Sequence, residues 1–410
     1  MARDIPYILR RGVAEIIVEE ELTRLLESGR TLRLKQGFDP SRPDIHLGHV
    51  VGLRKLRQFQ ELGHQVILII GDWTAQIGDP SGQSQTRPML SAEEVRANAE
   101  SYMRQFFAVV DRERTTVVWQ SEWFGSFTLA DVISLTRRFT VAQMLAREDF
   151  GRRYAQGRPI AITELLYPLL QAYDSVVIEA DVEFGGIDQK FNCLVGRELQ
   201  EMVGQRPQQV FLMPLLVGTD GSQKMSKSLG NYIAVDEPPQ EMYGKAMSIT
   251  DGLIMDYFEL LTDVPDAELD EAREALARGS ANPMGLKKRL AREIVAQFHG
   301  DGAAQAAEAE FERVVQRGEV PQAVPEHGLP PDAFAAPVSR RGLEVILVQA
   351  RLAESRAEAK RLLSSGAVEL DGQRPAGDAV AIRDGSIVKV GKRRFVRLVA
   401  SDRQAIPGPP

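Results

Sequence analysis

The sequence predicts an α/β protein: a doubly wound, Rossmann-like parallel sheet, followed by a helical domain and a small α+β domain. Strand and helix patterns alternate along the first half of the chain, which is typical of such a sheet. Strand signals fade after about Asp236, and a compact segment with short strands resumes beyond a proline-rich stretch. With 410 residues, the chain is also too long for one ordinary domain.

The strands of the sheet are predicted from apolar runs, and its helices from apolar residues at helical spacing. Residues 31–38 fit a strand, and residues 47–62 fit a helix. The continuous apolar run 65–70 (QVILII) is expected of a parallel strand that is covered on both faces. Ser91 and Glu94 have the spacing of a capping box, which predicts that a helix begins there. Further strands are expected at residues 115–119, 175–180 and 210–213.

These patterns divide the chain into four parts. Residues 1–235 are expected to form the Rossmann-like domain, and residues 236–318 a largely helical domain. The segment 319–338 is rich in proline and poor in large apolar side chains, so we expect it to be a linker. Residues 339–410 combine two helical patterns with short strands and Asp-Gly turns, which predicts the small α+β domain.

Charge is unevenly distributed along the chain. The net charge is −7, yet residues 339–400 hold 13 Lys and Arg against 7 Asp and Glu. A basic segment on an acidic body suggests a module that binds a polyanion. A solvated surface explains such charge almost as often, so composition alone does not decide between the two.

The cellular location is predicted from what the sequence lacks. No apolar run approaches the roughly 18 residues that a membrane helix needs, and the N-terminus shows no apolar signal core. The single cysteine, Cys193, excludes an internal disulfide and fits a reducing cytosol. We therefore expect a cytoplasmic protein without a membrane contact, in which Cys193 is a small buried hydrophobe.

Two short segments indicate chemistry on ATP. In the segment 43–49 (PDIHLGH), His46 and His49 share one face at the start of a helix, where the backbone also favours phosphate. Gly48 lacks a Cβ, so a nucleotide can lie against the backbone. The segment 224–228 (KMSKS) adds two ammonium groups on a polar loop, and such a loop can close over a pyrophosphate. An H-x-x-H pair can also bind a metal, but no third ligand accompanies it, so no protein metal site is expected.

The pairing of HLGH with KMSKS resembles the class I aminoacyl-tRNA synthetases, and the residues between them resemble the tyrosyl-tRNA synthetase family. Three stretches carry this likeness: residues 77–82 (IGDPSG), 167–174 (YPLLQAYD) and 185–189 (GGIDQ). Tyr167, Gln171 and Asp174 also form one polar stripe on a helix, which is expected to line a pocket. The resemblance implies a tyrosine–tRNA ligase, which activates L-tyrosine with ATP, releases pyrophosphate and transfers tyrosine to the 3′ end of tRNA(Tyr).

The resemblance also implies roles for individual residues. Asp174 is expected to accept the phenolic hydroxyl of tyrosine, and Asp188 to contact the ribose of ATP. The tyrosine-binding residues it implies are Asp79, Tyr167, Gln171, Asp174 and Gln189. The ATP-binding residues it implies are Asp39, His46, Gly48, His49, Arg87, Asp188, Lys224 and Lys227, of which His46, His49, Lys224 and Lys227 are catalytic. For Arg87, a solvated loop arginine explains the residue almost as well as a phosphate contact. Mg²⁺ is expected to accompany ATP, and the resemblance implies a homodimer.

The sequence departs from the family pattern near the phenol. Many bacterial members place a second tyrosine just before Gly-Phe-Asp-Pro, whereas Lys35 and Gln36 stand there in this chain. Asp174 is therefore expected to have a different helper. Residues 190–192 read KFN, where the commoner form is Trp-Gly-Asn, and Gln83 replaces a lysine found elsewhere. These departures resemble the second, thermophile-like bacterial branch of the family.

Residues 355–372 resemble the RNA-binding domain of the S-four ribosomal-protein type. The residues expected to contact RNA phosphates are Arg356, Lys360, Arg361, Lys392, Arg393 and Arg394. Two alternatives to the tyrosine–tRNA ligase stay open. One is a tryptophanyl-tRNA synthetase, which shares the fold and both motifs. The other is a non-catalytic RNA-binding protein built on a synthetase scaffold.

Overall fold

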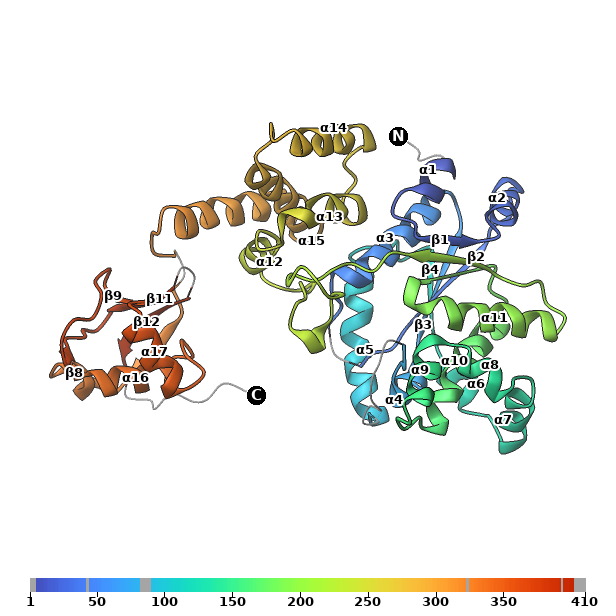
Figure 1. Ribbon diagram of the computed structural model, residues 1–410, viewed down its shortest axis with the longest axis horizontal. Coiled ribbons are helices and arrows are strands. Elements are labelled where there is room, and N and C mark those ends of the chain that lie inside the picture. Colours follow the sequence, from blue (N-terminus) through green and yellow to red (C-terminus); the bar gives the residue numbers. More distant parts are fainter. Residues whose placement is uncertain (1–4, 42–43, 82–89, 322–323, 392–393, 402–410) are drawn as a thin grey trace. The chain divides into compact units, whose positions relative to one another are not determined.

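The computed structural model describes residues 5–41, 44–81, 90–321, 324–391 and 394–401. The chain divides into two compact units, residues 1–300 and residues 301–410 (Figure 1). Among the described residues, no helix combines the length and the apolar character that crossing a membrane requires.

A six-stranded sheet forms the centre of the first unit, with strand order β1-β6-β5-β2-β3-β4. All neighbouring strands are parallel except β1, which is antiparallel to β6. The strands are β1 (Glu15–Ile17), β2 (Arg33–Phe38), β3 (Gln65–Ile70), β4 (Thr115–Trp119), β5 (Val182–Gly186) and β6 (Gln209–Met213). The chain winds outward from β2 to β4 and then returns to β5 beside β2. The carboxyl ends of β2 and β5 therefore flank the switch point at which such sheets bind ligands.

Four long helices accompany this sheet: α3 (Leu47–Glu61), α5 (Ala92–Phe106), α10 (Ile162–Val177) and α11 (Lys190–Met202). Shorter helices complete the unit up to β6: α1 (Ile5–Arg10), α2 (Glu19–Glu27), α4 (Thr74–Ile77), α6 (Ser121–Phe124), α7 (Leu129–Thr136), α8 (Val141–Leu145) and α9 (Glu148–Ala155). The expected capping box is confirmed, because Ser91 and Glu94 exchange side-chain and backbone hydrogen bonds at the start of α5.

The strand expected at residues 175–180 is wrong. Residues 175–177 are the last turn of α10, and the strand is β5, which begins at Val182. The β-branched run Val176-Val177-Ile178 favours a strand locally. The helix nevertheless continues, because Ser175 is fully buried on the inner face of α10. The chain leaves the helix through Glu179, whose φ of 47° is left-handed.

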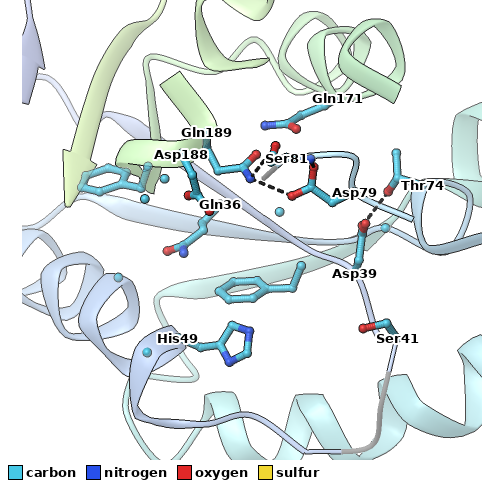
Figure 2. A pocket seen from close by; sticks show the side chains of 18 of the residues that line it. Gln36, Asp39, Ser41, His49, Thr74, Asp79, Ser81, Gln171, Asp188 and Gln189 are labelled. Atoms are coloured by element: carbon cyan, nitrogen blue, oxygen red, sulfur yellow. Dashed lines mark hydrogen bonds between the residues drawn. The ribbon is translucent and has the colours of Figure 1, made fainter. Parts of the chain in front are cut away.

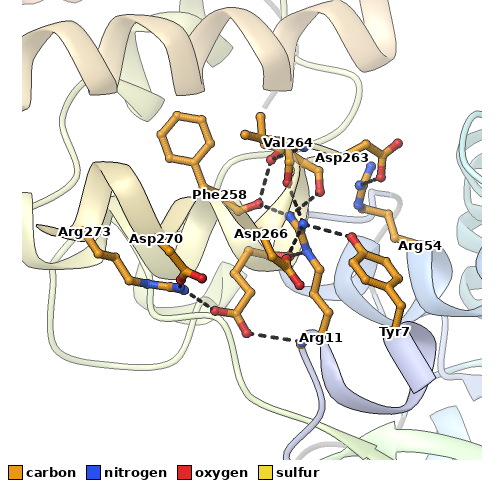
Figure 3. Close-up of polar contacts among 12 residues, drawn as sticks. Tyr7, Arg11, Arg54, Phe258, Asp263, Val264, Asp266, Asp270 and Arg273 are labelled. Atoms are coloured by element: carbon orange, nitrogen blue, oxygen red, sulfur yellow. Dashed lines mark hydrogen bonds and ion pairs between the residues drawn. The ribbon is translucent and has the colours of Figure 1, made fainter. Parts of the chain in front are cut away.

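A helical region follows β6 within the first unit: α12 (Pro239–Ala246), α13 (Ile254–Leu261), α14 (Asp266–Ala277) and the first part of α15 (Pro283–Phe311), which is interrupted at Gly300. Buried Arg11, just after α1, fastens this region to the N-terminus (Figure 3). Its guanidinium donates to the carbonyls of Phe258, Thr262 and Val264 and pairs with Asp266 at 2.8 Å. One cation thus satisfies the carbonyls exposed at the end of α13.

The second unit contains a small α+β domain after the end of α15. Its helices are α16 (Arg340–Gln349) and α17 (Arg356–Ser364). A four-stranded sheet has the order β7-β12-β11-β9, and a second sheet pairs β10 with β8. These strands are β7 (Glu326–Leu329), β8 (Val338–Ser339), β9 (Val368–Leu370), β10 (Ala379–Val380), β11 (Ile387–Val390) and β12 (Arg394–Ala400). The core between helices and sheet includes the fully buried Leu347, Val388 and Leu398.

The segment 319–338 is more ordered than a linker. Its residues Glu326–Leu329 form β7, which runs parallel to β12 and thereby belongs to the small domain. Buried Leu329 joins the apolar core of that domain, and Phe334 and Val338 of the same segment pack against this core. The four domain boundaries themselves stay a prediction.

Candidate active site

A pocket of about 350 Å³ opens at the carboxyl ends of β2 and β5 (Figure 2). It gathers most of the residues that the sequence singled out: Asp39, His46, Gly48, His49, Asp79, Tyr167, Gln171, Asp174, Asp188, Gln189 and Lys224. Lys227 lies at its edge, where its ammonium group donates to the carbonyl of Asp44. Arg87 lies outside the described residues. The two motifs, about 175 residues apart in sequence, therefore meet at one pocket.

The two histidines of the first motif cap the helix α3. The Nδ1 atom of His46 accepts from the backbone N–H of Gly48 at 3.2 Å, and that of His49 accepts from the backbone N–H of His46 at 3.2 Å. Because each Nδ1 is an acceptor, the proton of each neutral ring lies on Nε2. A Cβ at residue 48 would stand 2.9 Å from the His46 ring, so glycine is also required by the cap itself.

Both imidazoles are kept neutral by their surroundings. Burial is the largest cause and lowers the pKa of His49 to about 3, with Lys227 adding to the effect. The pKa of His46 is lowered for the same reason, and His49, Lys227 and Lys224 depress it further. The rings are 4.0 Å apart, so neither could carry a charge cheaply beside the other. They therefore offer two neutral N–H donors rather than cations.

The second motif is tied to the first through the backbone. Leu47 donates to the carbonyl of Ile233 at 3.0 Å, and Val235 donates to that of Ile45 at 3.0 Å. This short ladder places the loop that carries the lysines beside the start of α3. The Lys224 ammonium pairs with the Asp188 carboxylate at 2.8 Å, and both residues line the pocket.

Asp174, at the end of the polar stripe, is buried and holds two donors from another element. Gln120 donates to its Oδ2 at 2.8 Å, and the Trp123 indole donates to its Oδ1 at 3.2 Å. Burial raises the pKa of Asp174 to about 7, against the opposing effects of Lys35 and of the Gln120 amide. Sequence reasoning missed both donors. Gln120 directly follows β4, so the rule that sites form at carboxyl ends of strands could have found it.

Tyr167, the first residue of the polar stripe, contacts Asp39, and both line the pocket. The Tyr167 hydroxyl donates to Asp39 Oδ2 at 2.8 Å, and Thr74 donates to Asp39 Oδ1 at 2.7 Å. Burial and the negative charge of Asp39 raise the pKa of Tyr167 well above its usual value. Tyr167 is therefore a protonated phenol that still has lone pairs for a donor in the pocket.

Two glutamines line the pocket and are held together from behind. Buried Asn192 donates to the Oε1 atoms of Gln171 and Gln189, each at 3.1 Å. Gln189 in turn donates to Asp79 Oδ2 at 2.8 Å (Figure 2). The Asn192 oxygen accepts from buried Arg147 at 3.2 Å. Neither Asn192 nor Arg147 was predicted as a site residue. Asn192 stands only three residues after Gln189, in the stretch compared with the family, whereas no motif spacing links Arg147 to the pocket.

The basic residues of the small domain lie on two elements. Arg356, Lys360 and Arg361 are exposed on α17. Arg394, on β12, is also exposed but donates to the carbonyl of Leu352 at 2.8 Å. Lys392 and Arg393 lie outside the described residues. Over the part of the chain that the structure describes, no group of three or more His, Cys, Asp or Glu could hold a metal ion.

Two family models match the chain. Residues 27–316 match the class I tRNA synthetases (W and Y), and residues 341–374 match the S4 domain. The tyrosine–tRNA ligase of Dehalococcoides mccartyi (strain CBDB1) is 60% identical over 395 residues, which covers 96% of this chain and 98% of that protein. The tyrosine–tRNA ligase of Thermotoga maritima is 49% identical over 401 residues, covering 97% and 98%.

Solved structures agree with these matches. A tyrosyl-tRNA synthetase from Archaeoglobus fulgidus, crystallised with L-tyrosine, has a TM-score of 0.60 and 28% identity, covering 74% of this chain and 100% of that one. A tryptophanyl-tRNA synthetase from Plasmodium falciparum has a TM-score of 0.56 at 16% identity, which shows a common fold alone. The fold and the two family models are those of a class I aminoacyl-tRNA synthetase with an S4 domain. Within that class, the chain belongs to the tyrosine–tRNA ligase family.

Proposed function

We propose that the pocket joins L-tyrosine to ATP and that the chain then transfers tyrosine to tRNA(Tyr). The tyrosine carboxylate attacks the α-phosphorus of ATP in line, the bond to the β-phosphate oxygen breaks, and pyrophosphate leaves. The ribose hydroxyl at the 3′ end of tRNA(Tyr) next attacks the carbonyl of tyrosyl-adenylate, and AMP leaves. The observation that carries this proposal is that both motifs and the stripe ending in Asp174 line one pocket.

Tyrosine is proposed to bind with its phenol toward Asp174 and its ammonium group toward Tyr167, Gln171 and Asp79. All three ammonium partners present oxygen acceptors. The Tyr167 oxygen can accept because the hydroxyl donates its own proton to Asp39. Asp174 is anchored by its donors Gln120 and Trp123, which leaves its remaining lone pairs for the phenol. Gln189 is proposed to lie near the reacting carboxylate.

ATP is proposed to lie across the start of α3, with Asp39 and Gly48 close to it. The Nε2–H groups of His46 and His49 donate to its phosphates, and Lys224 and Lys227 neutralise the departing pyrophosphate. Arg87 is proposed as a further phosphate contact. The Lys224–Asp188 ion pair must open first, because Asp188 is proposed to accept a ribose hydroxyl. Mg²⁺ is proposed to arrive bound to the triphosphate.

Amino-acid-dependent exchange of pyrophosphate into ATP tests this proposal directly. We expect exchange with tyrosine and none with tryptophan or phenylalanine at equal concentration. Exchange driven by tryptophan would move the assignment of the pocket to the other amino acid of this synthetase class. Folded protein that exchanges with none of the three would contradict the proposed activation step.

The exposed cations of α17 are proposed to bind tRNA phosphates, together with Arg394, Lys392 and Arg393. Replacing Arg356, Lys360 and Arg361 by glutamine is expected to raise the KM for tRNA in aminoacylation. The salt dependence of that KM should flatten by a little under one power of salt concentration for each phosphate that the variant no longer neutralises. Tyrosine-dependent pyrophosphate exchange should stay unchanged. Each single variant should raise the KM for tRNA by part of this amount. A loss of pyrophosphate exchange as large as the loss of aminoacylation would refute this assignment.

The protein is proposed to act as a homodimer in the cytoplasm. Large apolar side chains are exposed on the helices α7 to α10 and their neighbours: Leu129, Ile133, Val141, Tyr154 and Ile162. Apolar surface of this kind favours a protein interface. Sedimentation equilibrium of the intact chain should give twice the chain mass of 45.5 kDa. A monomer at micromolar concentration would contradict the dimer. Buried Cys193 is compatible with a reducing compartment.

A further inference from the structure

A buried ion pair lies directly behind the pocket, and its lysine stands just before the Gly-Phe-Asp-Pro stretch. Lys35, on β2, is fully buried, and its ammonium group is 2.9 Å from the carboxylate of Glu183 on β5. The same ammonium donates to the Ser175 hydroxyl at 2.6 Å and to the Gln171 carbonyl at 2.7 Å. All three of its protons are thus used inside the protein.

Glu183 extends the contact to the pocket wall. Its Oε1 accepts from the Gln171 side-chain amide at 3.1 Å, and its Oε2 accepts from buried Gln208. The ion pair therefore contacts Gln171 at two points, through Lys35 at its backbone carbonyl and through Glu183 at its side-chain amide, in addition to the contact from Asn192. Because Gln171 lines the pocket, the ion pair fixes the orientation of a group that faces the ligand.

The ion pair also acts electrostatically on Asp174, although burial has the larger effect on the pKa of that carboxyl. The positive charge of Lys35 favours the ionised carboxylate of Asp174, and the negative charge of Glu183 opposes it. The other groups that act on Asp174 are the neutral donors Gln120 and Trp123 and, on its own helix, the phenol of Tyr167. Tyr167 is also influenced by the negative charges of Asp39 and Asp79. Among these groups, Lys35 carries the positive charge that favours the ionised form of Asp174.

We propose that the Lys35–Glu183 ion pair is a positioning and specificity-determining element of the tyrosine pocket. It holds the Gln171 amide toward the ligand, and it keeps Asp174 available as an ionised acceptor for the phenolic hydroxyl. A buried ion pair is seldom retained for stability, since apolar residues of similar volume serve as well. The inference rests on the proposed binding of tyrosine, and it assigns to Lys35 a role that an additional tyrosine would fill by direct contact.

Two substitutions that remove opposite charges, Lys35→Met and Glu183→Gln, distinguish this role from a purely structural one. The KM for tyrosine in pyrophosphate exchange should rise as the pH falls through the midpoint at which Asp174 is protonated. In Lys35→Met this midpoint should move about one pH unit upward, because the favourable cation is lost. In Glu183→Gln it should move downward, because the opposing anion is lost. Damage to packing alone would not shift the two midpoints in opposite directions.

The double variant Lys35→Met/Glu183→Gln keeps the test valid if a single variant does not fold, because it leaves no buried charge unpaired. Its midpoint should lie near that of the original protein. Its KM for tyrosine should rise about tenfold, because Gln171 loses the ammonium group at its backbone carbonyl and the charged acceptor at its side chain, and only Asn192 and a neutral acceptor still hold it. The KM for ATP should not change. A double variant with the original KM for tyrosine would overturn the proposal, as would single-variant midpoints that move together. The unaltered protein, run in parallel, reports separately whether tyrosine supports exchange at all.

Discussion

Replacing Asp174 by alanine is expected to remove most of the preference for tyrosine over phenylalanine. The kcat/KM for tyrosine in pyrophosphate exchange should fall about 100-fold, which corresponds to about 3 kcal/mol for a lost hydrogen bond to a charged group. The value for phenylalanine should fall little or rise, because phenylalanine would no longer leave a buried carboxylate unpaired. Measuring both constants in the same preparation gives the ratio directly. An unchanged ratio would contradict the role of Asp174.

The variant Asp174→Asn is the matched control. It keeps an oxygen acceptor and the volume of the side chain, so its preference for tyrosine should lie between those of the original protein and the alanine variant.

The variant Asp174→Asn also removes a group that titrates. The raised pKa of Asp174, about 7 in the folded protein against an ordinary value of 3.8, means that the unfolded chain binds fewer protons between those values. The free energy of unfolding should therefore fall as the pH rises from about 4 to about 7. Asp174→Asn should lose this contribution to the pH dependence, which denaturant titrations at several pH values can measure.

Elements whose signal lies within one short, continuous stretch of sequence were predicted correctly. β3 was predicted with its observed bounds because a continuous apolar run identifies a covered parallel strand by itself. The polar stripe on α10 was predicted for the same kind of reason, since one helix carries all of it. The strand expected at residues 175–180 failed because local β propensity was overruled by the burial of Ser175 against Lys35.

The partners of the predicted residues could not be found in this way. Asp174 accepts from Gln120 and Trp123, which are more than 50 residues away in sequence. Lys35 pairs with Glu183, which lies on β5, a strand distant in sequence that runs parallel to β2. The resemblance to the family indicated that Lys35 and Gln36 stand where many bacterial members have a second tyrosine. It did not show that a buried ion pair stands in its place, because pairing between distant strands leaves no periodic trace.

Removing the phosphate donors at the start of α3 is expected to have the largest effect on the rate. In His46→Asn, the asparagine oxygen can still accept from the Gly48 N–H, so the cap of α3 is retained while the Nε2–H donor is lost. The kcat of tyrosine-dependent exchange should fall about 100- to 1,000-fold, as for other single donors that stabilise charge in a transition state. The KM for tyrosine should stay within about twofold, because this donor lies on the side of the pocket assigned to ATP.

His64 provides a matched control for this result. It is also a buried histidine, and its Nδ1 accepts from the backbone N–H of Leu32 at 3.3 Å, but it does not line the pocket. The variant His64→Asn should therefore lose stability without losing kcat.

Because burial keeps His46 and His49 neutral, the kcat of the unaltered protein at saturating tyrosine should be flat between pH 6 and pH 8. A kcat that falls as either histidine is titrated in that range would mean that the imidazoles act as cations, and the assignment of neutral N–H donors to the phosphates would be wrong.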